Sequence, residues 1–183
     1  MSDDLRMLAD ESANDARHYL ATVTEVASGA APDAAIPMTL LALSQALVMG
    51  TRLAAIQDIV PAERFEADTT DPELDPLRTG FANLFDGLDD YADLVDPVTS
   101  TELTTGSLSN DIAVVAGALA HGLRHHDAGR LSEALWWWQF SYLSDWGERA
   151  AAALRVLQSV LGHIRLDADE ETIAEAEFDA LHP

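Results

Sequence analysis

All four tryptophans of this chain lie between Ala134 and Gly147, in a segment that reads ALWWWQFSYLSDWG. We predict that this segment is helical. Each residue of an α-helix advances by about 100° around the helix axis, so the side chains of Trp136, Trp137 and Trp138 cannot share one face. At least one of these three indoles must therefore point away from the hydrophobic core.

Three side-chain stripes on this helix decide which tryptophan is the exception. Two stripes are apolar and are predicted to face the core, namely Leu135–Trp138–Tyr142 and Trp136–Phe140–Leu143. The third stripe is polar except at Trp137 and runs through Arg130, Glu133, Trp137, Ser141, Ser144 and Glu148. Either long loops cover Trp137 as ordinary packing, or Trp137 lines a groove or partner interface with Arg130, Ser141 and Ser144 as polar companions.

Two further helices precede this segment. Apolar residues at helical spacing predict a helix from Asp3 to Ala27, with Ser2 as its N-cap and Gly29 as its stop. No charged residue occurs from Ile36 to Thr51, which predicts a second helix inside the core. In this helix Ala42, Ala46 and Gly50 form a smooth strip that allows a neighbouring helix to approach closely. Polar residues interrupt the apolar run, so we do not predict a membrane span.

The remaining elements complete a helical fold. We expect a long loop over 57–80 and a second loop over 98–109. A third helix is predicted over 77–94, and a fourth is capped by Ser109 or Asn110 and ends near His126. A fifth helix is predicted over 132–164, with a bend at Gly147. No strand is predicted. The fold class is therefore all-α, an antiparallel bundle of about five main helices with two long loops. Residues 1–166 form one domain, and residues 167–183 form an acidic tail that is a short helix or disordered.

Composition excludes several functions. The 183 residues include 32 Asp and Glu against 10 basic residues, all arginine, for a formal net charge of -22. This charge opposes binding to nucleic acid or to anionic membranes. The absence of cysteine excludes disulfides, thiol nucleophiles and cysteine-ligated metals. The N-terminal residues lack a signal-peptide pattern, so we predict a cytoplasmic location.

Signals for catalysis are weak. His121 and His125 lie four residues apart, on one helical face, and form a weak candidate pair of metal ligands that would need a third from His163, Asp111 or a loop carboxylate. Favourable placement at a helix C-terminus explains the same pair without a metal. The common hydrolase, zinc-protease and dinucleotide motifs are missing, and no phosphate loop is complete. We predict no cofactor and no catalytic residue, and we lean against an enzyme.

Several short pieces together resemble a bacterial domain-of-unknown-function family that is common in actinobacteria. The tryptophan segment is the specific piece, and the others are VTEV at 23–26, DIVPAER at 58–64, AGR at 128–130 and HIRLD at 163–167. The resemblance spans most of the chain. It implies a cytoplasmic bacterial protein and carries over no activity, substrate, cofactor or catalytic residue.

Three hypotheses for function follow from these residues. The first is a non-enzymatic helical interaction module that uses the Trp137 face for a protein partner or for self-association, with a preference for basic partners. The second is a small-molecule pocket with aromatic walls between the fourth and fifth helices, where Arg124 or Arg130 holds an anionic ligand. The third is a metal-dependent enzyme that uses His121 and His125. The candidate binding residues are Arg130, Trp136, Trp137, Trp138, Ser141 and Ser144.

Overall fold

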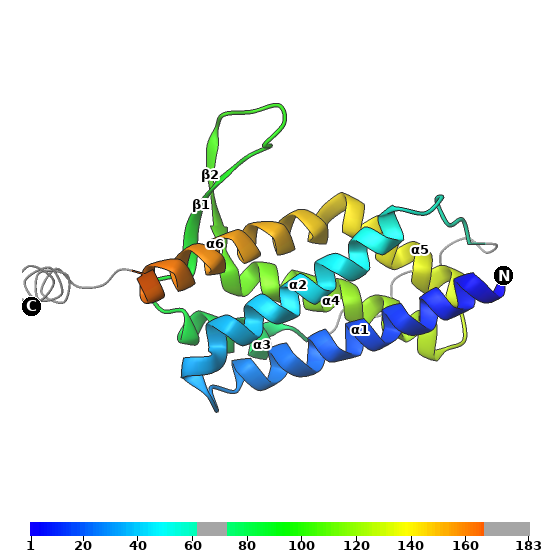
Figure 1. Ribbon diagram of the computed structural model, residues 1–183, viewed down its shortest axis with the longest axis horizontal. Helices are drawn as coiled ribbons and strands as arrows, with labels where there is room; N and C mark the ends of the chain where they lie inside the picture. Colours follow the sequence, from blue (N-terminus) through cyan, green and yellow to red (C-terminus); the bar gives the residue numbers. More distant parts are fainter. Residues whose placement is uncertain (62–72, 167–183) are drawn as a thin grey trace, which may run out of the picture.

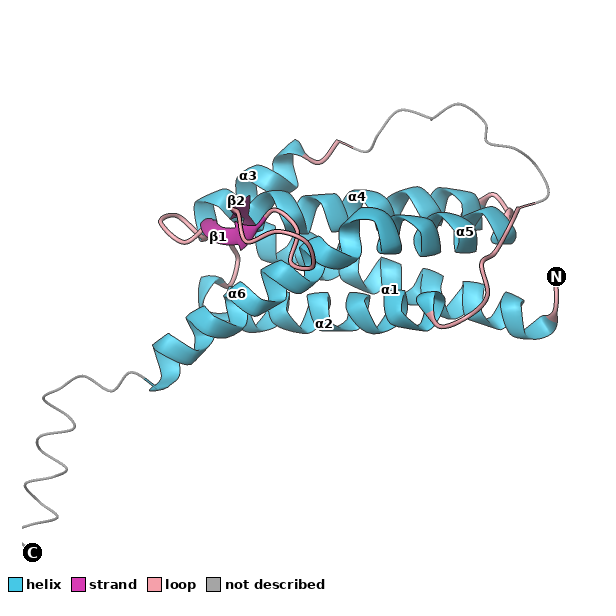
Figure 2. Cartoon of the chain, turned by 90° about the horizontal axis from the view of Figure 1, so that it is seen from above, coloured by secondary structure: helices cyan, strands magenta, loops and turns pink. Residues whose placement is uncertain are grey.

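The protein is an antiparallel bundle of long helices, as the computed structural model shows for residues 1–61 and 73–166 (Figures 1 and 2). The helices are α1 (Asp3–Ala27), α2 (Ala35–Ala54), α3 (Asp75–Leu84), α4 (Leu108–Asp127), α5 (Leu131–Ser141) and α6 (Gly147–Leu166). The predicted all-α bundle is confirmed, with a small two-stranded sheet added to it. The prediction for the tail, 167–183, lies outside the described residues.

Helix α1 has the predicted bounds. The Oγ of Ser2 accepts a hydrogen bond from the backbone N–H of Leu5 at 3.3 Å, and Gly29 takes a φ of 71° after the helix ends. A side chain at this φ would be strained, which is why glycine stops the helix here. The buried face of α1 is rich in alanine and contains Ala9, Ala13, Ala16, Tyr19 and Val23.

Helix α2 packs between α1 and α6. The predicted smooth strip is confirmed, because Ala42 and Ala46 are 1% exposed and Gly50 lies directly against the ring of Tyr142 and the indole of Trp146. The segment Pro32–Ala54 is long and apolar enough by composition to cross a membrane, but a buried core helix has the same composition. Its buried residues face α1 and α6, as expected for a core helix.

The region between α3 and α4 differs from the prediction. The long loop ends earlier, because Pro76 occupies the first turn of α3, where proline is tolerated. The third helix stops at Leu84 instead of continuing to residue 94, and Gly87 turns the chain with a φ of 78°. The second predicted loop is in part a strand: β1 (Asp90–Leu94) pairs antiparallel with β2 (Leu103–Ser107), and the hairpin projects from the bundle (Figure 1).

Asp89 explains why the third helix does not continue. Its carboxylate accepts hydrogen bonds from the backbone N–H of Ser109 at 2.7 Å and from the hydroxyls of Ser107 and Ser109. The negative carboxylate compensates the partial positive charge at the N-terminus of α4, and these hydrogen bonds hold Asp89 at the first turn of that helix. The N-cap of α4 is Ser107, whose Oγ accepts from Asn110 N at 3.2 Å, and not Ser109 or Asn110 as predicted.

The predicted fifth helix is interrupted by a turn of π-helix at Tyr142–Trp146. The bend lies just before Gly147, close to its predicted position, and Gly147 begins α6. The hydroxyl of Ser141 makes hydrogen bonds on both sides of this turn. It donates to the carbonyl of Trp137 at 2.6 Å and accepts from Nε1 of Trp146 at 3.1 Å. Turns of π-helix inside α-helices are frequent at functional sites.

Candidate functional site

The three consecutive tryptophans have three different environments. Trp138 is fully buried, and its Nε1 donates to the carbonyl of Leu119 at 3.1 Å. Trp136 and Trp137 are only partly buried. The prediction that one core cannot hide all three indoles is confirmed for this helix.

One of the two stripes predicted to face inward is on the surface. Phe140 is 50% exposed and Leu143 is 63% exposed, and the ring of Trp136 stacks on that of Phe140 with centroids 4.9 Å apart. Helix α5 packs against α1, α2 and α4, which leaves the Phe140 side of α5 exposed in the part of the chain that the structure describes. The sequence pattern could not show this, because an apolar stripe looks the same whether it faces a core or solvent.

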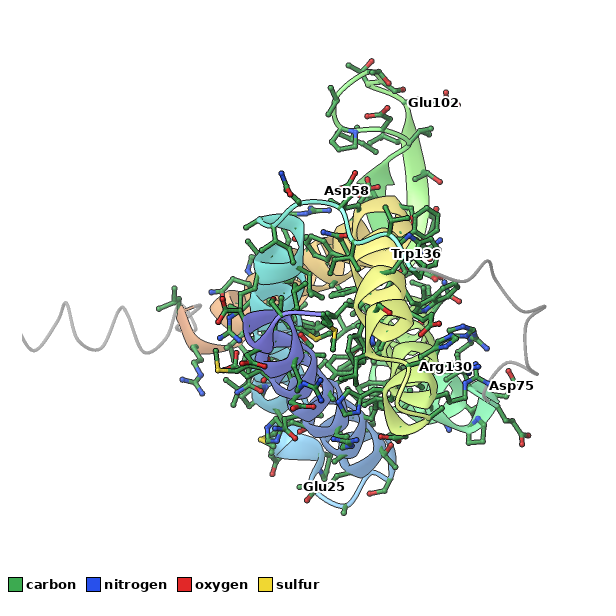
Figure 3. The ribbon with its side chains drawn as sticks, turned by 90° about the vertical axis from the view of Figure 1, so that its right-hand side faces the viewer. Glu25, Asp58, Asp75, Glu102, Arg130 and Trp136 are labelled. Atoms are coloured by element: carbon green, nitrogen blue, oxygen red, sulfur yellow. The ribbon has the colours of Figure 1, made fainter. Side chains whose placement is uncertain are left out.

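Trp137 forms the wall of a hollow between α3, α4 and α5. Its indole stacks on the imidazole of His121, with centroids 3.9 Å apart and an angle of 28° between the planes. The hollow has a volume of about 610 Å³. Its lining includes Leu74 and Arg78 of α3 and the turn before it, Gly117 and His121 of α4, and Trp137, Phe140, Ser141 and Ser144. Figure 3 shows Arg130, Trp136 and Asp75 along the same side of the molecule.

The predicted site residues are only partly brought together. Trp137, Ser141 and Ser144 all line the hollow, whereas Arg130 precedes α5 and does not line it, and Trp138 belongs to the core. The hydroxyl of Ser144 donates to the carbonyl of Phe140 at 2.8 Å. Both serines therefore use their protons on the helix backbone. Because Ser141 also accepts from Trp146, one oxygen lone pair of Ser141 and both of Ser144 are left for a ligand.

The indole N–H of Trp137 is a buried donor without an acceptor in the part of the chain that the structure describes. An unsatisfied buried donor costs about 1–3 kcal/mol. The indole N–H of Trp138, by contrast, has its acceptor in Leu119. The two neighbouring tryptophans thus differ in burial and in hydrogen bonding. Trp137, whose N–H has no acceptor among the described residues, lines the hollow.

The hydrogen bonds of the histidine pair indicate which ring nitrogen of His121 carries the proton. Arg124 can only donate, so its contact of 2.8 Å with Nδ1 of His121 makes that nitrogen an acceptor. The proton of neutral His121 then lies on Nε2, which donates to Nε2 of His125 at 3.4 Å.

This protonation of His121, with the proton on Nε2, does not suit a metal ligand. A neutral imidazole that binds a metal through Nε2 carries its proton on Nδ1 and usually donates it to a carboxylate or carbonyl. At His121 that nitrogen faces a guanidinium. Among residues 1–61 and 73–166, no three potential ligands gather around a common point. Asp111 lies at the opposite end of α4 from His121.

A second polar cluster, which the sequence analysis missed, surrounds Asp111. Its side chain is 4% exposed, and it accepts hydrogen bonds from the hydroxyl of Tyr91 at 2.5 Å and from Arg149 at 3.1 Å. Burial raises the pKa of the Asp111 carboxyl above its ordinary value, against the opposing effect of Tyr91 and Arg149. The cluster joins the hairpin, α4 and α6, so we assign it a structural role.

This raised pKa predicts a specific pH dependence. A carboxyl whose pKa is higher in the folded state binds protons more tightly when folded, so its contribution to stability falls as pH rises through the folded pKa. The stability of the wild type relative to Asp111→Asn should therefore increase as pH is lowered from 7 toward 3.8, the ordinary pKa of an aspartate side chain. Urea denaturation of both proteins at several pH values measures this difference. A difference that shrinks on acidification would contradict the raised pKa.

Gln139 is another residue that the sequence analysis missed. Its Nε2 donates to the carbonyl of Leu53 at 2.8 Å, and its Oε1 accepts from the N–H of Ile59 at 2.9 Å. These bonds fasten the chain after α2 to α5. Its position beside three tryptophans was a usable signal, because a buried amide requires partners.

Comparisons with known proteins place the chain in a family. Residues 3–163 match the family described as Domain of unknown function (DUF5063), and the chain belongs to it. The comparison with curated proteins found no match. In fold the chain is similar to protein BF1032 from Bacteroides fragilis, whose crystal structure gives a TM-score of 0.66 at 16% identity over 87% of this chain and 93% of that one. This likeness concerns the fold alone.

Proposed function

We propose that the protein is a non-enzymatic binding module whose site is the aromatic face of α5, formed by Trp136, Trp137, Phe140 and Leu143. The observation that carries this proposal is the continuity of the hollow with exposed apolar surface. Phe140 lines the hollow, is 50% exposed and stacks on Trp136. Contiguous exposed apolar surface beside a concave site is typical of protein interfaces, where tryptophan and phenylalanine are enriched.

The charge around the aromatic face favours a basic protein partner. Glu73, Asp75 and Asp145 border the hollow, against Arg78, which is bonded to Asp75 at 2.9 Å. The whole chain has a net charge of -22. A partner with an apolar anchor and flanking Lys or Arg would be attracted by this field, and the attraction would act mainly on the association rate.

Site-directed photocrosslinking tests this proposal. A photoreactive phenylalanine analogue is placed at position 140 or 143 and, as the control, at Val98, which is 90% exposed at the hairpin tip. Irradiation in cells of the source organism should give the same adduct from positions 140 and 143 and not from 98. The purified partner should then bind the wild type and lose about tenfold or more in affinity for Phe140→Asp. No shared adduct, or unchanged affinity, would contradict the proposal.

A small-molecule site is the second candidate function. The hollow of about 610 Å³ lies within the usual range for such sites, and the stacked Trp137 and His121 give it a flat aromatic wall. Of the two arginines proposed for an anionic ligand, Arg124 contacts His121, which lines the hollow. Native mass spectrometry of protein purified from its source cells tests this candidate: a stoichiometric small molecule that is absent from Trp137→Ala supports it, and its absence from the wild type rejects it.

We further propose that the protein is bacterial and cytoplasmic and comes from the actinobacterial part of its family. The tryptophan segment and the use of arginine as the only strongly basic residue support this lineage. Fractionation of source cells, with detection of the chain in the soluble cytoplasmic fraction, tests the location.

A further inference from the structure

The outer side of α2 carries an apolar stripe that the bundle does not use. Met38, Leu41 and Val48 are 37%, 52% and 51% exposed, and Gln45 is exposed between them. Their spacing of three, four and three residues is that of the a and d positions of a coiled coil. We call these four residues the α2 stripe. Its spacing is that of a helix that packs against a second helix, although no described part of this chain covers it.

Charge indicates which second helix fits. Two copies of a chain with a net charge of -22 repel each other over most of their surfaces. Helix α2 has no acidic residue, and its charged residue is Arg52. The neighbouring α6 has one acidic residue, Glu148, and three arginines, of which Arg149 and Arg155 are ion-paired within the chain. The surface around α2 is therefore where another acidic molecule, including a second copy of this chain, approaches at the lowest electrostatic cost.

We propose that a second copy of this chain docks here, with the α2 stripe of one copy packed against that of the other in a parallel pair. Helix α2 lies between α1 and α6 (Figure 1). A two-fold axis parallel to α2 places α1 of each copy opposite α6 of the other. Since α1 carries six acidic residues against two arginines, this arrangement sets an acidic helix against one with a single acidic residue, Glu148. An antiparallel pair would set α1 against α1.

Two details of the α2 stripe fit a parallel pair. Gln45 occupies a central a position, where the two amides of a symmetric pair can hydrogen-bond to each other and fix the register. A hollow of about 470 Å³ borders Gln45, Val48 and Arg52 on the α1 side and gives space for a side chain of the second copy. This surface is separate from the aromatic face of α5, so the inference does not depend on the proposed function.

Oligomeric state tests the dimer. Sedimentation velocity of the whole chain from about 1 to about 100 μM should show a monomer–dimer equilibrium with a micromolar dissociation constant. The double variant Leu41→Asp, Val48→Asp should weaken the dimer by about a hundredfold or more, because each copy would bury two carboxylates. Its thermal unfolding should stay close to that of the wild type, since both positions are about half exposed.

The control is Val98→Asp, which adds the same charge at an exposed position far from α2 and should leave the dissociation constant unchanged. A wild type that stays monomeric at 100 μM would overturn the inference. So would a dimer that survives in the α2 double variant. Dissociation by Phe140→Asp instead would place self-association on the aromatic face.

Disulfide trapping tests the orientation, which the cysteine-free chain makes simple. Two cysteines form a disulfide only when their Cα atoms are about 4.4–6.8 Å apart. In a parallel pair residue 41 faces residue 41 and residue 48 faces residue 48, so Leu41→Cys and Val48→Cys should each form covalent dimers on mild oxidation. Val98→Cys is the control and should not. Crosslinks that appear only when the 41 and 48 variants are mixed would show an antiparallel pair and overturn the proposed orientation.

Discussion

Gly122→Ala is expected to destabilise the protein by about 2–3 kcal/mol, although alanine is the better helix former. The indole of Trp138 lies directly on the Cα of Gly122, where a Cβ would overlap Nε1 and the adjoining ring atoms. Trp138 is fully buried and cannot move aside without losing its hydrogen bond to Leu119. The loss of packing and of this bond outweighs the gain of about 1 kcal/mol from removing a glycine inside a helix.

Gly117→Ala is the matched control, because Gly117 also lies inside α4. Among the described residues, a Cβ at this position would meet Cδ1 of Leu74 alone, at 2.9 Å, and Leu74 is a flexible side chain at the edge of the hollow. We expect this variant to be more stable than the wild type by about 0.5–1 kcal/mol. Urea denaturation followed by circular dichroism measures both changes. Equal effects at the two glycines would show that the contact with Trp138 does not decide stability.

Local signals in the sequence were sufficient for the long helices. The ends of α1 were predictable because Ser2 and Gly29 act on their own backbone neighbours. Helix α2 was predictable because its uncharged run is interrupted by polar residues, although the exposure of its outer side was not. Gly129, with a φ of 75°, ends α4 for the same local reason as Gly29 ends α1. These features depend on chemistry within a few residues and need no tertiary information.

The hairpin was missed because distant contacts decide it. Residues 77–94 have helical spacing, but Asp89 is bound by the first turn of α4, and the ring of Tyr91 lies on Gly106 with its hydroxyl on Asp111. These contacts outweigh a local preference for helix in the second half of the segment. Propensity is a weak guide wherever tertiary contacts of this kind compete with it.

The candidate site was predicted in outline and not in detail. Angular arithmetic separated Trp137 from Trp138 but predicted the stripe of Trp136, Phe140 and Leu143 to face the core. In the structure Trp137 packs against the core, whereas Trp136 stacks on the exposed Phe140. The hollow depends on where α3 lies, which the sequence did not show. The hydrogen-bond partners of Gln139 and Asp111 were missed because a single polar residue in a helix gives no sign of which backbone or side chain it meets.

Trp138→Ala should cost about 3–5 kcal/mol, the usual range for removing a large aromatic side chain from a core. Trp138 is 0% exposed and its N–H is bonded to the carbonyl of Leu119, so the variant would leave a cavity and lose this hydrogen bond. A typical domain is stable by about 5–15 kcal/mol, so this variant should unfold at much lower urea concentration or be partly unfolded at 25 °C.

The comparison with Phe140→Ala makes this prediction specific to the position and not merely to aromatic residues. Phe140 is only two residues away on the same helix, but its side chain is 50% exposed and contacts mainly Trp136. Its replacement should cost about 1 kcal/mol or less, because little buried area is lost. Since Phe140 belongs to the aromatic face, the same variant should weaken partner binding while leaving the fold intact. If Phe140→Ala destabilised the chain as much as Trp138→Ala, Phe140 would be a core residue and the aromatic face would not be a binding surface.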